Sequence, residues 1–153
     1  MKKFSFTLQS VLNVKRAQEK QRMGELAECN ARIRENRRLL QESYDHQQAQ
    51  NVLYQREYED GMKPYRLRMW GWAMNALRDR IAYRKKVLET AEGELARIQK
   101  ALVTVMQERK MLESLREKQM EEYRAEERRE NDAVIAEFVG FSAFGDGERP
   151  QTP

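Results

Sequence analysis

The side chains that most often carry out chemistry are scarce in this sequence. His46 is the only histidine and Cys29 is the only cysteine. One histidine cannot build a two-histidine metal site, and one cysteine can form neither a Cys-x-x-Cys pair nor an intrachain disulfide. We therefore expect no metal site and no cofactor, and we interpret Cys29 as a small packing residue rather than a nucleophile.

The acidic residues and the glycines offer no better catalytic site. Carboxylate-rich helices build di-metal centres through Glu-x-x-His pairs, and the sequence contains no such pair. Gly140 and Gly145 have the glycine spacing of a phosphate-binding loop, but the Lys and Ser/Thr that should follow are missing. The sequence supports no enzyme, so we look for its function in binding surfaces.

The composition is typical of long helices rather than of a thick globular core. Of the 153 residues, 40% are hydrophobic and 35% are charged, and the mean hydropathy is −0.94. Proline is absent from residues 1–63 and again from residues 65–149, so nothing interrupts a helix in either range. Two very long helices are therefore allowed.

A heptad pattern runs along residues 67–112. From Leu67, alternating steps of three and four residues reach positions that are apolar with two exceptions. These positions are Trp70, Met74, Leu77, Ile81, Arg84, Leu88, Ala91, Leu95, Ile98, Leu102, Val105, Arg109 and Leu112. A repeat averaging 3.5 residues keeps a narrow stripe on one side of a helix, and such a stripe packs along another helix. The pattern predicts a rod-like coiled coil.

The first part of the chain predicts a second helix, over about residues 7–60, with a weaker seam. The expected seam positions are Met23, Leu26, Asn30, Ile33, Arg37, Leu40, Tyr44, Gln47, Asn51, Tyr54 and Tyr58. Upstream of Met23 the phase of the pattern slips near Leu12, which predicts a stutter in the coiled coil.

Residues 60–64 form the clearest break in the sequence. Gly61 suits the left-handed position that ends a helix, and Pro64 suits the first turn of the next one. The predicted fold class is all-α, a long antiparallel two-helix coiled-coil hairpin in a single domain, residues 1–140. Helix two is expected over about residues 64–139, and residues 141–153 are expected to be a disordered tail.

The two predicted helices differ in length, about 75–80 Å against about 110 Å, so helix two should overhang from roughly residue 118. Its seam becomes polar there, as an unpaired helix requires; the positions are Arg116, Gln119, Tyr123, Glu126 and Glu130. Two apolar ends, residues 4–14 and 134–144, are then too far apart to cover each other. We expect these uncovered apolar ends to insert into a socket of a partner protein.

Two tryptophans, Trp70 and Trp72, flank Gly71 just after the break. In one interpretation Trp70 packs in the seam and closes the end of the hairpin. In the other, Trp72 is an exposed anchor for a partner, because it lies about 200° around the helix from Trp70. The sequence alone leaves both interpretations open.

The net charge is +4, but basic and acidic residues alternate, as on a solvated helix face. We therefore expect no nucleic-acid partner. No apolar run is long enough to span a membrane and no secretory signal is visible. We expect a cytoplasmic protein without direct membrane insertion.

Several segments resemble one known family when they are taken together and in order. The chain opens with Phe-x-Phe-x-Leu-x-x-Val-Leu at residues 4–12 and continues with Arg-Ala-Gln-Glu-Lys at residues 16–20. The tryptophan-containing start of helix two leads to Leu77 and Ile81, and the chain carries Arg128 and Arg129 before Ala-Glu-Phe-Val at residues 136–139. Over about residues 1–140 the chain resembles the FliJ family of flagellar export proteins, which includes the stalk proteins of type III secretion injectisomes.

This resemblance implies a rod similar to the central stalk of rotary ATPases, located at the cytoplasmic side of the inner membrane. Its ends would bind the hexameric flagellar export ATPase, its side would bind the cytoplasmic domain of the export gate, and export chaperones are further partners. The ATPase-binding ends would be Phe4, Phe6, Leu8, Val11, Leu12, Val134, Ile135, Phe138 and Val139. The gate-binding surface would be Tyr44, Leu77, Arg80, Arg84 and Trp72.

The alternative is a structural coiled-coil adaptor or homodimer without an ATPase partner. In that case the seam of residues 67–112 would hold two chains together, and deletion of the apolar ends would have little effect.

Overall fold

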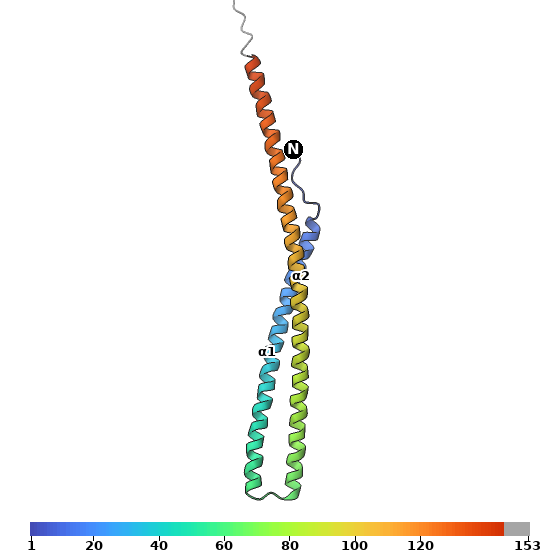
Figure 1. Ribbon diagram of the computed structural model, residues 1–153, viewed down its shortest axis with the longest axis vertical. Helices are drawn as coiled ribbons and strands as arrows, with labels where there is room; N and C mark the ends of the chain where they lie inside the picture. The colour runs from blue at the N-terminus through green and yellow to red at the C-terminus, as the bar shows by residue number, and fades with distance from the viewer. Residues whose placement is uncertain (146–153) are drawn as a thin grey trace, which may run out of the picture. The chain divides into compact units, whose positions relative to one another are not determined.

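The computed structural model describes residues 1–145 and contains two α-helices in that range (Figure 1). Helix α1 spans Gln9–Glu59 and helix α2 spans Pro64–Gly145. The expected all-α class, with two long helices that pack against each other, is confirmed. The chain divides into two compact units, which are described separately. Unit 1 combines Met1–Ala17 with the chain from Met106 onward, and unit 2 is Gln18–Val105.

Helix α2 continues six residues beyond its expected end near residue 139. The prediction of a disordered tail from residue 141 is wrong for residues 141–145, which are helical. Gly140 lowers helix propensity by only about 1 kcal/mol, and no proline follows before residue 150. The helix therefore continues through it. The rest of the expected tail, residues 146–153, lies outside the described residues.

The turn of unit 2 has the local chemistry that ends one helix and begins another. Gly61 has a φ of 96°, a conformation that side chains with a Cβ rarely adopt. Its N–H donates to the carbonyl of Tyr58 at 3.2 Å. Pro64 is the first residue of α2, where its missing N–H has no helical acceptor in any case. The chain therefore reverses direction within a few residues.

The predicted seam of α2 is confirmed by burial. Every expected position from Trp70 to Leu112 is buried or half-buried, and only Leu67 at its start is exposed. The most deeply buried members are Leu77, Ile81 and Ala91. The seam includes Arg84, so a charged residue occupies a covered position among apolar neighbours.

The predicted seam of α1 is half wrong. The positions shared with the prediction, from Leu26 to Tyr54 at seven-residue spacing, are covered. The other half of the seam lies one residue earlier than predicted. Its predicted members Met23, Asn30, Arg37, Tyr44, Asn51 and Tyr58 are all exposed. The covered positions are instead Arg22, Cys29, Asn36, Ser43, Gln50 and Glu57.

The observed α1 pattern also contains no stutter. Steps of three and four residues lead back without interruption from Arg22 through Glu19 and Lys15 to Leu12, and all four are covered. Long polar side chains tolerate such positions because their stems pack while their charged ends reach water. Small residues also fit there, since a narrow seam leaves little space.

The core of unit 2 is centred on Cys29, whose side chain is fully buried. Its thiol lies 3.5 Å from the carbonyl oxygen of Ala91, and Ile33 completes the buried cluster. Leu88, Leu95 and Ile98 pack against this cluster. The interpretation of Cys29 as a small packing residue agrees with this burial.

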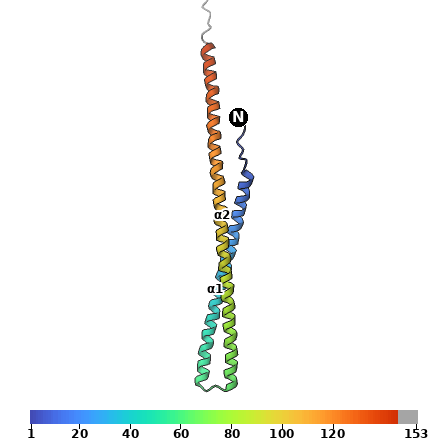
Figure 2. The ribbon, with the colours of Figure 1, turned by 45° about the vertical axis from the view of Figure 1, so that its right-hand side comes forward.

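Ion pairs show the relative direction of the two helices in unit 2. Arg32 pairs with Glu94 at 3.2 Å and Arg37 with Glu92 at 3.3 Å. Residue numbers rise along α1 while those of their partners fall along α2, so the pairing is antiparallel. Figure 2 shows these parts of α1 and α2 side by side, joined by the turn.

In unit 1 the first residues of the chain pack on α2. The guanidinium Nε of Arg116 donates to the side-chain oxygen of Gln9 at 3.1 Å. The Tyr123 hydroxyl donates to the carbonyl of Lys2 at 2.6 Å, and the ring centroids of Phe4 and Tyr123 lie 5.5 Å apart. The pairing thus reaches beyond residue 118, where it was expected to end. A non-helical segment covers up to about 3.3–3.6 Å per residue, against 1.5 Å for a helix.

Candidate partner-binding surfaces

The N-terminal apolar residues are divided between the core of unit 1 and its surface. Phe6 and Leu12 are buried and Phe4 is half-buried, whereas Leu8 and Val11 are exposed. The expectation that this end of the chain is uncovered is therefore wrong for Phe6 and Leu12. They alternate with exposed residues because one side of the segment packs on α2.

The C-terminal apolar residues are exposed, as expected. We define the C-terminal apolar segment as Val134, Ile135, Phe138, Val139, Phe141 and Phe144. All six are at least 59% exposed, and Phe138 reaches 74%. The Met1 amine pairs with Glu130 at 3.9 Å, and Glu130 lies four residues before this segment begins. The segment is therefore a helix with large apolar side chains and no cover within the described part of unit 1.

The expected gate-binding residues lie in unit 2 and differ in exposure. Leu77 is buried in the seam, so its side chain is not accessible to a partner of the free hairpin. Tyr44 and Arg80 are exposed. The Lys85 ammonium lies 5.6 Å from the centroid of the Tyr44 ring, and interaction with the Tyr44 side chain raises the pKa of Lys85. The two helices thus contribute adjacent polar groups.

Arg84 lines a hollow between α1 and α2 in unit 2. The hollow has a volume of about 260 Å³. It is lined by Leu39, Glu42, Ser43, His46, Leu77, Arg80 and Arg84. The Nε atom of Arg84 is buried without a hydrogen-bond partner. Within the described chain, no ion pair involves the side chains of Arg80 or Arg84, whereas Glu42 is paired with Arg38. Two guanidinium groups at one hollow attract an anionic group such as a carboxylate.

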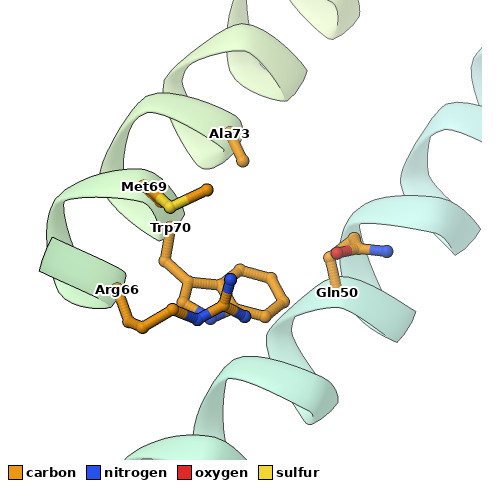
Figure 3. A pocket seen from close by; sticks show the side chains of 5 residues that line it. All are labelled: Gln50, Arg66, Met69, Trp70 and Ala73. Atoms are coloured by element: carbon orange, nitrogen blue, oxygen red, sulfur yellow. The ribbon is translucent and has the colours of Figure 1, made fainter. Parts of the chain in front are cut away.

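The two tryptophans have different environments. The Trp70 ring points from α2 toward α1, beside the hollow that Gln50, Met69 and Arg66 help to line (Figure 3). The indole N–H of Trp70 donates to the Glu57 carboxylate at 2.5 Å. Trp72 is 71% exposed. Trp70 therefore packs in the seam, as the first interpretation expects, and Trp72 has the exposure that the second interpretation requires.

Glu57 holds the two helices together next to the turn. Arg66 donates to both of its carboxylate oxygens, at 2.6 and 3.0 Å. These bonds, and then the bond from Trp70, lower the pKa of Glu57 below its ordinary value. The Tyr54 ring meets the Trp70 ring edge-on at 5.8 Å. The pattern of hydrophobic residues could not indicate this cluster, because its central residue is a charged side chain in a covered position.

Within residues 1–145, no group of three or more His, Cys, Asp or Glu side chains is placed to hold a metal ion. No helix in the same range has the length and apolar character that crossing a membrane requires. The features that the structure does present are apolar and charged surfaces on helices, which suit binding to other macromolecules.

A comparison with models of known protein families identifies the family of this chain. The family model described as "Flagellar FliJ protein" matches residues 4–147, nearly the whole chain. The chain belongs to the FliJ family, whose members are structural components of the flagellar export apparatus. No similar curated protein and no similar solved structure was found.

Proposed function

We propose that this protein is a stalk-like, non-enzymatic coupling component of the flagellar type III export apparatus. It binds the hexameric export ATPase through its terminal residues and the cytoplasmic domain of the export gate through unit 2. Export chaperones are a further class of partner. The protein acts at the cytoplasmic side of the inner membrane. Membership of the FliJ family supports this assignment.

The observation that carries the ATPase contact is the exposure of the C-terminal apolar segment. Its members are spread over more than half of the helix circumference, since successive residues are about 100° apart. This apolar face is wider than the stripe of an ordinary amphipathic helix, and exposed apolar patches often mark interaction sites. Insertion into a pore formed by a ring of subunits would cover such a helix on all sides. Leu8 and Val11 are the N-terminal residues that remain accessible for the same contact.

The ATPase contact is tested by the steady-state ATP hydrolysis rate of the export ATPase, titrated with this protein. We expect the native chain to stimulate hydrolysis and the double variant Ile135→Asp/Phe138→Asp to lose most of that stimulation. The matched control is Val103→Asp/Met111→Asp, which places the same charges at exposed apolar positions elsewhere on α2. Equal stimulation by both double variants would remove the C-terminal apolar segment from the proposal, and absence of stimulation by the native chain would favour the adaptor alternative.

The gate contact is supported by the hollow of Arg80 and Arg84 and by the exposed aromatic residues Tyr44 and Trp72 nearby in unit 2. Aromatic and arginine side chains often dominate binding energy at protein interfaces. The unpaired guanidinium groups favour a partner that presents a carboxylate. The bound partner would thereby supply the acceptor that Arg84 lacks in the free chain.

Binding of the purified cytoplasmic domain of the gate protein, measured by calorimetry, tests this contact. We expect Arg80→Glu to weaken the affinity by about tenfold or more, as truncation or reversal of interface arginines commonly does. The control is Arg34→Glu, an equal charge change at an exposed position of α1. An equal loss of affinity in both variants would mean that the gate responds to overall charge and not to this hollow.

A further inference from the structure

A second apolar stripe runs along the outer side of α2 in unit 2. It consists of Tyr65, Met69, Trp72, Ala76 and Tyr83, and all five are exposed. The intervals are four, three, four and seven residues, which is the heptad spacing of a coiled-coil seam. We call this set the outer stripe.

The outer stripe is separate from the seam that holds the hairpin together. At about 100° per residue, its members fall within roughly 60° of one another. Trp70, Met74, Leu77 and Ile81 of the seam are centred on the opposite side of the helix, about 140° away by the same count. Packing of α1 on α2 therefore leaves the five side chains exposed, although Met69 and Ala76 also line hollows beside α1.

The surroundings of the outer stripe are strongly basic. Residues 63–86 contain eight basic side chains and one acidic side chain, Asp79. The basic residues are Lys63, Arg66, Arg68, Arg78, Arg80, Arg84, Lys85 and Lys86. Arg68 and Lys86 border the stripe on one side and Arg80 on the other, and all three are exposed. In the described part of the chain, no acidic side chain pairs with any of the three. This charge is therefore available to a partner.

We propose that the outer stripe binds an acidic amphipathic helix of a partner protein. That helix would pack along α2 as a third helix of the coiled coil. The stripe extends over about 27 Å from Tyr65 to Tyr83, which is five helical turns. A partner helix with an apolar seam of the same period would cover the aromatic residues. Glutamates beside that seam would meet Arg68, Arg80 and Lys86, as charges flanking a seam select partners in coiled coils.

Two other occupants fit the stripe less well. A second copy of this chain would bring two basic borders together if stripe packed on stripe, and like charges at that spacing destabilise pairing. A lipid surface requires a broad apolar face, whereas this stripe is narrow and Asp79 occupies a heptad position within it. The outer stripe shares Trp72 and Arg80 with the proposed gate-binding surface, so this proposal rests in part on the same residues. Its test uses designed peptides, so its failure is distinguishable from failure of the gate contact or of the ATPase contact.

The test uses two fluorescently labelled designed peptides of 21 residues and the full-length protein. Both peptides carry leucine at the two seam positions of each heptad; one has glutamate and the other lysine at the flanking positions. Fluorescence anisotropy reports their binding. We expect the glutamate peptide to bind and the lysine peptide not to bind. Met69→Ala/Trp72→Ala should weaken binding of the glutamate peptide by about tenfold or more.

The matched control is Val103→Ala/Met111→Ala, which truncates apolar side chains of 52% and 72% exposure outside the outer stripe. Its affinity for the glutamate peptide should equal that of the native chain. Loss of affinity in both double variants, or in neither, would overturn the proposal. Binding to phosphatidylglycerol vesicles without binding to the glutamate peptide would also overturn it and would assign the stripe to a lipid surface. None of these results depends on the export ATPase, so failure here is distinguishable from failure of the stalk proposal.

Discussion

Arg84 places an unsatisfied polar group inside the hydrophobic seam of unit 2. It occupies a covered position in the α2 seam, between Ile81 and Leu88, and its Nε has no hydrogen-bond partner. An unsatisfied buried polar group destabilises a fold by about 1–3 kcal/mol. In the proposed gate contact, a carboxylate of the partner would supply the missing hydrogen-bond acceptor for Arg84 and offset this cost.

We predict that Arg84→Leu stabilises the hairpin by about 1 kcal/mol, because it removes the unpaired group and adds apolar contact to the seam. Thermal unfolding followed by circular dichroism measures this change. The control Arg78→Leu alters an exposed position of the same helix and should leave Tm nearly unchanged. An Arg84→Leu variant less stable than the native chain would show that Arg84 has a structural partner in solution.

Glu57 provides a pH-dependent contribution to stability. Because hydrogen bonds from Arg66 and then Trp70 lower its pKa in the folded state, the contribution is present above the unfolded pKa and is lost as pH falls through the folded pKa. We predict that Glu57→Gln lowers Tm at pH 7 and that the difference from the native chain shrinks as the pH is lowered below about 4.5. Thermal scans of both proteins between pH 7 and pH 3 test this. A difference that stays constant over that range would contradict the prediction.

At the scale of the element, the sequence predicted α2 better than α1. The α2 seam is almost wholly apolar, so its hydrophobic pattern has one phase. In α1 the seam positions Arg22, Ser43 and Glu57 are polar, while the residues that follow them, Met23, Tyr44 and Tyr58, are more hydrophobic yet exposed. Hydropathy therefore favoured the wrong half of the α1 seam. The correct phase depends on which α1 residues fit beside the bulky residues of α2, and this is a property of the pair of helices.

Two glycines should respond in opposite ways to the same substitution. Gly61 has a positive φ in the turn, so Gly61→Ala should destabilise unit 2 by about 1 kcal/mol. Gly24 lies inside α1 with no atom near the position of an added Cβ, so Gly24→Ala should stabilise by about 1 kcal/mol. Chemical denaturation of the two variants measures both values. A stabilising Gly61→Ala would mean that the turn adopts another conformation in solution.

At the scale of the whole chain, protection from hydrogen exchange should follow the packing within each unit. We predict the slowest amide exchange around Cys29, Ile33 and Ala91, which form the buried cluster of unit 2. Residues 131–145 should exchange fastest among the helical residues, because nearly all of their side chains are exposed and an unpacked helix is only marginally stable in water. Exchange measured by mass spectrometry after peptic digestion tests this order. Equal protection of both regions would contradict it.

The candidate surfaces were only partly predictable from the sequence. The exposure of Trp72 followed from helical spacing and that of Phe138 from the expected difference in helix length, and both side chains are exposed. The burial of Phe6 and Leu12 did not follow, because the sequence does not reveal that a non-helical segment packs along α2. The hollow at Arg84 also depends on the register of the two helices, which heptad spacing leaves undetermined by multiples of seven residues.

The buried cysteine is a natural chemical probe of the transient separation of α1 and α2. Cys29 is the only thiol in the chain and is fully covered in unit 2, so a thiol-modifying reagent can reach it only when α1 and α2 separate. The labelling rate of the native chain therefore measures the frequency of that opening without any engineered probe. A partner that binds the closed hairpin would slow the labelling, whereas a partner that inserts between the helices would accelerate it.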